Sequence, residues 1–262
     1  MTRRLAVTEQ SRGAQASFIP RLFGSVAKVP ADPITNPVFD RLYDDAVPAL
    51  LVGEHRRDQP PVDGGRWPVS VVAVPDRRTR ELLAAVMAEA VVHAGPGHVE
   101  TGRSDANHLT VRALEPYREA ASPTDDATAQ WLAAMAEVGR ASAPVALRLT
   151  GVTLTVGGVM VQAEPLDDRP WELMRRLRAA LGPLAWFEDQ GHDRDIWYSS
   201  ILHFAAPVLD PAGLIGWVGD NRSSLSHDVT IDALTLTRFR HRVDGARRHM
   251  AMEPWHTVAL AG

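Results

Sequence analysis

Two stretches, Asn107-His108-Leu109-Thr110-Val111 and Ile201-Leu202-His203-Phe204-Ala205, decide the fold, and each has the pattern of a β-strand that carries one histidine. Side chains alternate along a strand, so residues two apart share a face. In the first strand, His108, Thr110 and Arg112 are therefore predicted to lie on one face, opposite the apolar side chains. This face would present a histidine and a hydroxyl together.

The second strand is predicted to place His203 on one face with Ser199, Ile201 and Ala205, while Tyr198 points to the other face. The two histidines are far apart in the chain, and we expect them to meet in one cleft as an acid and a base. Histidine suits this chemistry because its ordinary pKa lies near neutrality. The rest of the chain would then be the scaffold that brings the two rings together.

Composition narrows the classes of protein. The chain has 262 residues, enough for one large domain or two small lobes, and no run approaches the ~18 apolar residues of a membrane-spanning helix. It has no cysteine, which excludes disulfides and thiolate chemistry and fits a reducing cytoplasm. The net charge of −4 disfavours a duplex-binding surface. Lys28 is the only lysine, so a phosphate held by a side-chain cation is expected to be held by arginine.

The order of elements predicts a mixed fold with two similar halves, each carrying one histidine strand. Residues 1–30 lack periodicity and are expected to form a tail or a wrapping arm. Helices are predicted over residues 38–52, 80–93, 128–141 and 170–181 and after Asp210, and strands over residues 67–74, 107–114, 145–149, 152–156, 159–163, 197–206, 229–240 and 255–260. This pattern is typical of an α/β or α+β protein.

With these motifs in place, the chain resembles the 2H phosphoesterase superfamily, which includes 2′-5′ RNA ligase-like proteins and cyclic phosphodiesterases. That family carries two His-x-Thr/Ser-x motifs, one in each lobe. His108-Leu109-Thr110-Val111 matches fully, whereas His203-Phe204-Ala205-Ala206 has alanine in place of the hydroxyl. The resemblance covers about residues 66 to 260. It divides the chain into an N-terminal arm and short helix, 1–65, and a 2H phosphoesterase-like domain, 66–262.

The resemblance implies an α+β, bilobal fold in which two antiparallel sheets, flanked by helices, surround a central cleft. It also implies a metal-independent phosphodiesterase without a cofactor, acting on a 2′,3′-cyclic phosphate or a related small-molecule phosphoester, nucleotide or RNA end. Neither a membrane nor duplex DNA is expected as a partner. The catalytic residues would be His108 and His203, and the residues expected to bind the substrate are Thr110, Arg112, Arg238, Trp197 and Tyr198.

The alanine at position 205 leaves two alternatives open. Loss of one hydrogen-bond donor to a developing oxyanion typically costs ~10²–10³ in rate. The protein could therefore bind a nucleotide or phosphate ester without hydrolysing it. It could also be a 2H scaffold whose histidines transfer protons on a non-phosphate small molecule in a biosynthetic pathway. The sequence leaves open the substrate, which histidine is the base, the role of residues 1–65 and the oligomeric state.

Overall fold

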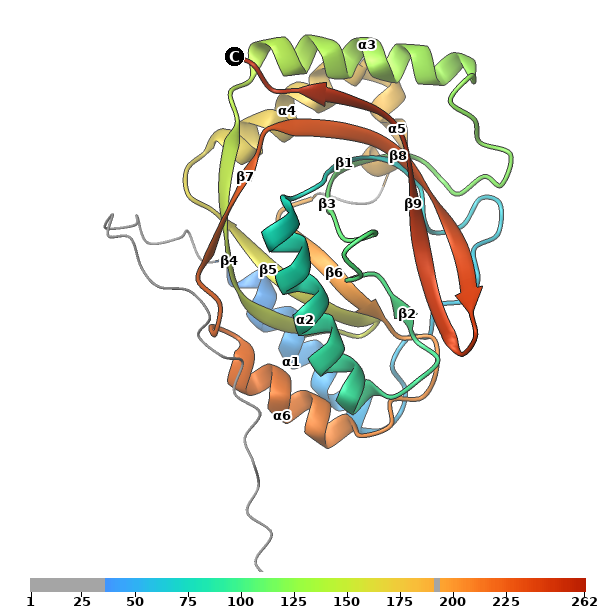
Figure 1. The fold of residues 1–262 in the computed structure, drawn as a ribbon, viewed down its shortest axis with the longest axis vertical. Coiled ribbons are helices and arrows are strands. Elements are labelled where there is room, and N and C mark those ends of the chain that lie inside the picture. The colour runs from blue at the N-terminus through green and yellow to red at the C-terminus, as the bar shows by residue number, and fades with distance from the viewer. Residues whose placement is uncertain (1–35, 191–193) are drawn as a thin grey trace, which may run out of the picture. The chain divides into compact units, whose positions relative to one another are not determined.

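The computed structural model describes residues 36–190 and 194–262, and all of them belong to one compact unit (Figure 1). The tail or arm expected over residues 1–30 lies outside the described residues. Residues 36–65, which the sequence places in an N-terminal arm and short helix, pack within the same unit as the rest. None of the described helices is long and apolar enough to cross a membrane.

The fold is α+β, and its strands form one hydrogen-bonded sheet. The strands are β1 (Val69–Ala73), β2 (Val99–Glu100), β3 (Leu109–Glu115), β4 (Val145–Thr155), β5 (Gly158–Pro165), β6 (Trp197–His203), β7 (His227–Ile231), β8 (Ala233–Asp244) and β9 (Arg247–Ala259). Their order in the sheet is β3-β1-β8-β9-β2-β6-β5-β4-β7. All pairs are antiparallel except β2 with β9, where Val99 lies opposite Arg248.

The sheet consists of two four-stranded halves, joined only by the two-residue strand β2. The two antiparallel sheets expected from the sequence are thus replaced by one sheet with a narrow link. One histidine strand, β3, belongs to the first half, and the other, β6, belongs to the second.

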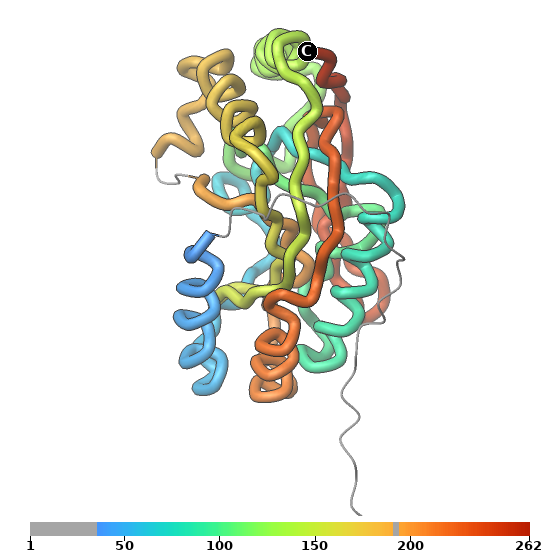
Figure 2. Tube along the Cα trace, turned by 90° about the vertical axis from the view of Figure 1, so that its left-hand side faces the viewer, coloured from blue at the N-terminus to red at the C-terminus, as the bar shows by residue number. Residues whose placement is uncertain are grey.

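Five of the described α-helices lie where the sequence predicts a helix. They are α1 (Val38–Leu51), α2 (Arg77–Ala94), α3 (Asp126–Ala141), α4 (Arg169–Leu181), α5 (Trp186–Asp189) and α6 (Pro211–Asn221), with a short 3-10 helix over Gly182–Ala185. Helices α1 and α6 pack side by side, as do α3 and α4 (Figures 1 and 2). The sequence did not predict β2, the 3-10 helix or α5. It also divided β4 into two strands and merged β7 with β8.

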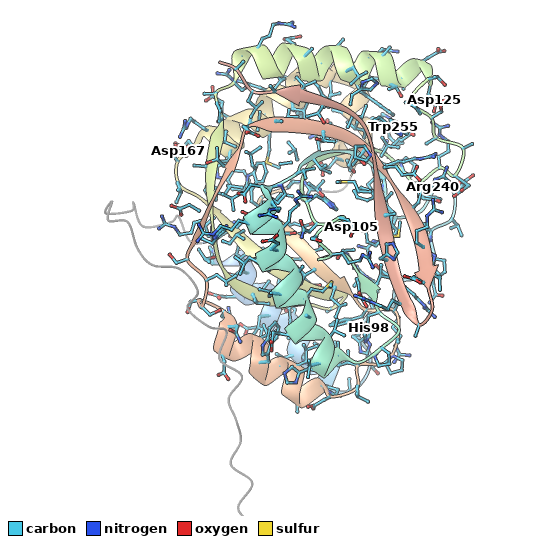
Figure 3. All side chains as sticks on the ribbon, viewed as in Figure 1. His98, Asp105, Asp125, Asp167, Arg240 and Trp255 are labelled. Carbon is cyan, nitrogen blue, oxygen red and sulfur yellow. The ribbon has the colours of Figure 1, made fainter. Side chains whose placement is uncertain are left out.

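Local chemistry sets several helix boundaries. The Asp76 carboxylate accepts a hydrogen bond from the backbone N of Thr79 at 3.0 Å and so caps α2. Asp167, in the turn before α4 (Figure 3), accepts one from the backbone N of Arg169 at 3.0 Å. Gly95, which follows α2, has a φ of 84°, a value that glycine adopts without the steric cost that other residues incur.

The hydrophobic core lies between the sheet and the helices. Leucines from both halves of the sheet and from the helices are fully buried in one cluster, among them Leu83, Leu109, Leu147, Leu177 and Leu214. Burying such a side chain contributes ~1.5–3 kcal/mol relative to leaving it exposed. The same cluster contains residues of β3 and β6, so the core fixes the backbones that carry the two histidines.

Candidate active site

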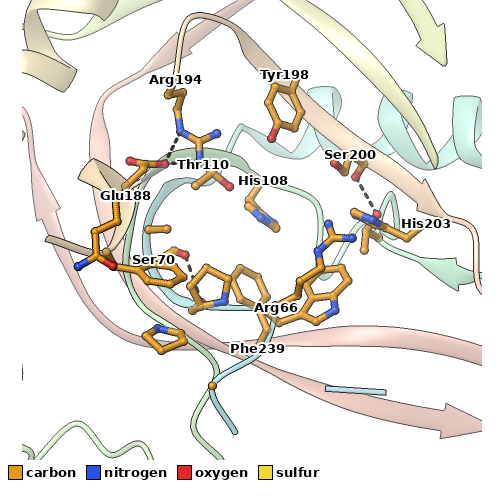
Figure 4. Close-up of a pocket in the computed structure, with 18 of the residues that line it drawn as sticks. Arg66, Ser70, His108, Thr110, Glu188, Arg194, Tyr198, Ser200, His203 and Phe239 are labelled. Atoms are coloured by element: carbon orange, nitrogen blue, oxygen red, sulfur yellow. Dashed lines mark hydrogen bonds and ion pairs between the residues drawn. The ribbon is translucent and has the colours of Figure 1, made fainter. Parts of the chain in front are cut away.

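Both sequence-predicted histidines line one cavity of about 620 Å³ (Figure 4). Its walls come from the segment before β1, from β3, from the α5 region, from β6 and from β8. Titratable or hydroxyl-bearing residues on the walls are Arg66, Ser70, Thr101, His108, Thr110, Glu188, Arg194, Tyr198, Ser200 and His203, and aromatic residues are Trp67, Trp186, Phe187 and Phe239. The cavity therefore combines polar groups with large apolar surfaces.

His108 immediately precedes β3 and is held by the backbone. Its Nδ1 lies 2.8 Å from the carbonyl oxygen of Ala106. A carbonyl oxygen only accepts hydrogen bonds, so Nδ1 carries the proton and Nε2 is the basic nitrogen. The ring packs against Phe239, with 4.8 Å between the ring centroids. Burial lowers the pKa of His108 to about 4, and the nearby charges of His203 and Arg194 act in the same direction.

His203 is the last residue of β6 and is held by a carboxylate. Its Nδ1 lies 3.3 Å from Oδ2 of Asp58, whose side chain is 4% exposed. Arg66 donates hydrogen bonds to both oxygens of that carboxylate, at 2.5 and 2.7 Å. Burial lowers the pKa of His203, and the contact with Asp58 opposes that shift. Burial alone would raise the pKa of Asp58, but the hydrogen bond from His203 and the charge of Arg66 outweigh it and hold that pKa below its usual range.

A β-bulge in β6 determines which side chains of this strand reach the cavity. Val159 of β5 lies opposite Leu202 and Met160 lies opposite Ser200, so Ile201 is the extra residue. The alternation shifts there, and Tyr198, Ser200 and His203 line the cavity. Two predictions for this strand were therefore wrong. Ser199 and Ile201, which were expected beside His203, are buried outside the lining, and Tyr198, which was expected to point away, faces the cavity.

A second bulge, in β3, changes the set of residues expected beside His108. Val72 of β1 lies opposite Thr110, but Val71 lies opposite Arg112, so Val111 is the extra residue. Thr110 lines the cavity and Arg112 does not.

Three of the predicted substrate-binding residues lie outside the cavity lining. The guanidinium of Arg112 donates to the carbonyl oxygen of Ala185 at 2.9 Å and pairs with Asp189. Arg238 pairs with Glu253 across the β8–β9 ladder, with 2.6 Å between Nε and Oε2. Trp197 is 1% exposed and packs in the core. Of the predicted set, the structure brings together His108, His203, Thr110 and Tyr198.

The cations that line the cavity are two arginines that the sequence analysis did not select. Arg66 extends from the segment before β1, and Arg194 precedes β6 (Figure 4). Arg194 donates two hydrogen bonds to one oxygen of Glu188, at 3.0 and 2.6 Å. Its guanidinium carbon lies 6.0 Å from the ring centroid of Tyr198. Both arginines lie in stretches without periodicity, so no sequence pattern indicates where their side chains point.

Among the described residues, no group of three or more His, Asp or Glu side chains could hold a metal ion. The two adjacent acidic pairs of the sequence, Asp125-Asp126 and Asp167-Asp168, lie at the starts of α3 and α4. The chemistry that the cavity offers is that of two imidazoles, several hydroxyls and two guanidinium groups.

Comparison with solved structures identifies the fold. The protein TT0787 of Thermus thermophilus superimposes with a TM-score of 0.53 at 16% identity, covering 73% of this chain and 97% of that protein. The chain has the 2H phosphoesterase fold. The comparison confirms the fold that the resemblance predicted.

Two further solved structures align over similar shares of the chain. Escherichia coli LigT complexed with 3′-AMP gives a TM-score of 0.48 at 15% identity, covering 75% of this chain and 99% of LigT. A protein described as a phosphoesterase gives 0.47 at 16% identity, covering 78% of this chain and 100% of its own. No family model matches the sequence, and no curated protein matches it.

Proposed function

We propose that the protein is a metal-independent phosphodiesterase that opens a 2′,3′-cyclic phosphate or a related phosphoester of a nucleotide or an RNA end. The observation that carries this proposal is the pair of histidines on one cavity, each with Nδ1 engaged by an acceptor, beside the hydroxyl of Thr110. The 2H phosphoesterase fold supports the same reaction class.

In the proposed reaction, His108 is the general base. Its lowered pKa keeps the ring neutral at physiological pH, with Nε2 available to take a proton from water. The water oxygen bonds to phosphorus as the bond between phosphorus and one ribose oxygen breaks. His203 in its protonated form gives its proton to that leaving oxygen. An anionic phosphate between the two rings favours the cationic form of each, which helps His203 to carry the proton.

The cavity walls fit a nucleotide-sized substrate. The volume of about 620 Å³ lies within the ~300–1,000 Å³ of small-molecule sites. Thr110 supplies a hydroxyl, and Arg66 and Arg194 supply positive charge for the non-bridging phosphate oxygens. Trp186, Phe187 and Tyr198 offer aromatic surfaces on which a base can stack. A cytoplasmic location remains a prediction from the absence of cysteine.

A second candidate function is binding of a nucleotide or phosphate ester without turnover. It is favoured by Ala205, because the second motif has no hydroxyl to bind the phosphate. Proton transfer on a non-phosphate molecule has less support, since such chemistry needs no cation near Thr110, and Arg194 lines the same cavity.

A panel of 2′,3′-cyclic mononucleotides tests these proposals. Cleavage that survives a chelator and is lost in both His108→Ala and His203→Ala supports the phosphodiesterase. Calorimetric binding of a mononucleotide that is recovered intact supports the binding protein. Turnover that needs an added metal ion, or that persists in both histidine variants, would contradict the two-histidine mechanism.

A further inference from the structure

His203 is supported by a segment that lies outside the family-like region of the sequence. The backbone N of Arg56 donates to the carbonyl oxygen of Val156 at 2.7 Å, next to the β4–β5 turn. The backbone N of Asp58 donates to the carbonyl oxygen of Phe204 at 2.7 Å, one residue after His203. These two bonds fix the main chain of the segment against the strand end that carries the histidine. The position of Asp58 is therefore determined by the backbone as well as by its carboxylate.

The Asp58 carboxylate is buried, ionised and directed at His203. Arg66 binds both of its oxygens, and the guanidinium of Arg56 lies 3.6 Å from Oδ1. An ionised carboxylate is only an acceptor, so the 3.3 Å contact requires a proton on Nδ1 of His203. The ring then presents Nε2 to the cavity. When Nε2 also takes a proton, the carboxylate stabilises the resulting cation.

Trp67 holds the same ring from another side. Its ring meets that of His203 edge-on, with 4.8 Å between centroids, and it also contacts Phe239. Of the non-glycine residues that the structure describes, only Trp67 has a positive φ, which is 75°. A bulky side chain rarely adopts this conformation, and such strain persists only where the surroundings impose it. Asp58, Arg66 and Trp67 together form the support of His203.

His108 has no such support, because its Nδ1 is bound by a neutral carbonyl oxygen. We propose that Asp58, itself held by Arg66, is a positioning residue that fixes the ring orientation and tautomer of His203 and makes it the proton donor to the leaving oxygen. This inference rests on the proposed phosphodiesterase function for its kinetic part only. The charged or titratable groups that face His203 are Asp58, Arg66, Arg56 and His108.

The kinetic test is Asp58→Asn. An amide can donate a hydrogen bond to Nδ1 and so favour the wrong tautomer, and comparable changes in a His-Asp pair lower kcat by up to ~10⁴-fold. We expect kcat on a 2′,3′-cyclic mononucleotide to fall on the order of 10²- to 10⁴-fold, with a much smaller change in KM. The matched control is Asp167→Asn, because Asp167 also pairs with an arginine but lies in the turn before α4 (Figure 3). Asp58→Glu keeps the charge and is expected to recover part of the lost kcat.

A second readout does not depend on catalysis. Nitrogen-15 NMR of the His203 ring reports which nitrogen carries the proton. The wild type should show the Nδ1–H form and Asp58→Asn should shift it toward Nε2–H, while Asp167→Asn leaves it unchanged. If Asp58→Asn does not fold, the wild type alone decides: on lowering the pH, His203 should take up its second proton at a higher pH than His108.

The outcomes separate the two proposals. Absence of turnover in the wild type would contradict the phosphodiesterase, yet the NMR result would still test the role of Asp58. An unchanged tautomer together with an unchanged kcat in Asp58→Asn overturns the positioning role. A wild-type His203 that protonates below His108 also overturns it, because the carboxylate would then not favour the cation.

Discussion

The two histidines lie on different walls of the cavity, and a different kind of hydrogen-bond acceptor holds each imidazole. On the first wall, a complete motif places Thr110 beside His108, and a backbone carbonyl fixes the ring. On the second wall, the motif lacks its hydroxyl, and a buried carboxylate from a distant segment fixes the ring. A neutral acceptor suits an imidazole that works uncharged, whereas an ionised acceptor suits one that works as a cation. Under the proposed function, this difference would let the two halves of the sheet divide the proton transfers, with His108 as the base and His203 as the acid.

The largest expected effects come from removing either ring. His108→Ala and His203→Ala should each lower kcat/KM on a cyclic phosphate by ~10²–10⁴-fold, the usual contribution of general acid–base catalysis. The pH profile distinguishes them. A base works unprotonated, so wild-type activity falls as the pH drops through the pKa of His108, about 4. An acid works protonated, so activity falls as the pH rises through the pKa of His203, which burial lowers from its ordinary value.

The residual activity of each variant should therefore keep only one limb of the profile. His108→Ala should lose the acidic limb, and His203→Ala should lose the alkaline limb. Initial rates measured between roughly pH 3.5 and 8 test this, because that span brackets the ordinary pKa values of carboxylates and histidines. The reverse pattern would exchange the roles of the two walls and contradict the division proposed above.

Thr110→Val should give the next largest effect. Valine keeps the shape of threonine and removes the hydroxyl, so a donor to the phosphate oxygen is lost, which typically costs ~10²–10³ in kcat. Thr155→Val is a suitable control, because its hydroxyl bonds to the carbonyl oxygen of Gly158 in the β4–β5 turn, away from the cavity lining. Single-turnover rates measure the effect. A rise in KM alone would place Thr110 in binding and remove it from the chemical step.

Arg194→Met should act mainly on binding. Methionine retains part of the apolar stem and removes the charge that faces the cavity beside Tyr198. A hydrogen bond to a charged group contributes ~1.5–3 kcal/mol, so we expect KM to rise about tenfold or more. Arg176→Met is the control, because Arg176 pairs with Glu172 on the surface of α4. An unchanged KM would show that Glu188 occupies Arg194 fully and that another group binds the phosphate.

The sequence predicted the parts of this molecule that depend on short-range pattern. Apolar periodicity together with helix start and stop signals located α1 to α4 and α6, and the alternation in the two motifs placed both histidines on strands or at their ends. It could not predict the bulges at Val111 and Ile201, because an extra residue in a strand depends on pairing with the neighbouring strand. For that reason the sequence correctly predicted that Thr110 lies on the same face as His108, and wrongly predicted that Tyr198 points away from His203.

Long-range contacts account for what the sequence did not reveal about the site. Asp58 approaches His203 across 145 positions only because two backbone hydrogen bonds tie its segment to the β4–β5 turn and the end of β6. Arg112 has the type and position expected of a phosphate ligand, yet Glu188, Asp189 and the Ala185 carbonyl surround its guanidinium. Neither outcome can be derived from spacing in the sequence.

Restoring the missing hydroxyl should give the smallest effect. Ala205 follows the end of β6 and donates its backbone N–H to Nδ1 of His98 at 3.2 Å. It packs against a small apolar cluster that includes Phe239, and Ala205 itself does not line the cavity. A hydroxyl added there in Ala205→Ser does not reach the phosphate, so kcat should change less than about threefold. Ser200, by contrast, faces the cavity because of the bulge, and Ser200→Ala should lower kcat roughly tenfold. Steady-state rates of both variants on one cyclic nucleotide test whether position 205 or position 200 supplies a hydroxyl to the phosphate. A gain near 10²-fold in Ala205→Ser would mean that the second wall still has room for the motif hydroxyl, and that the wild type is better described as a binding protein.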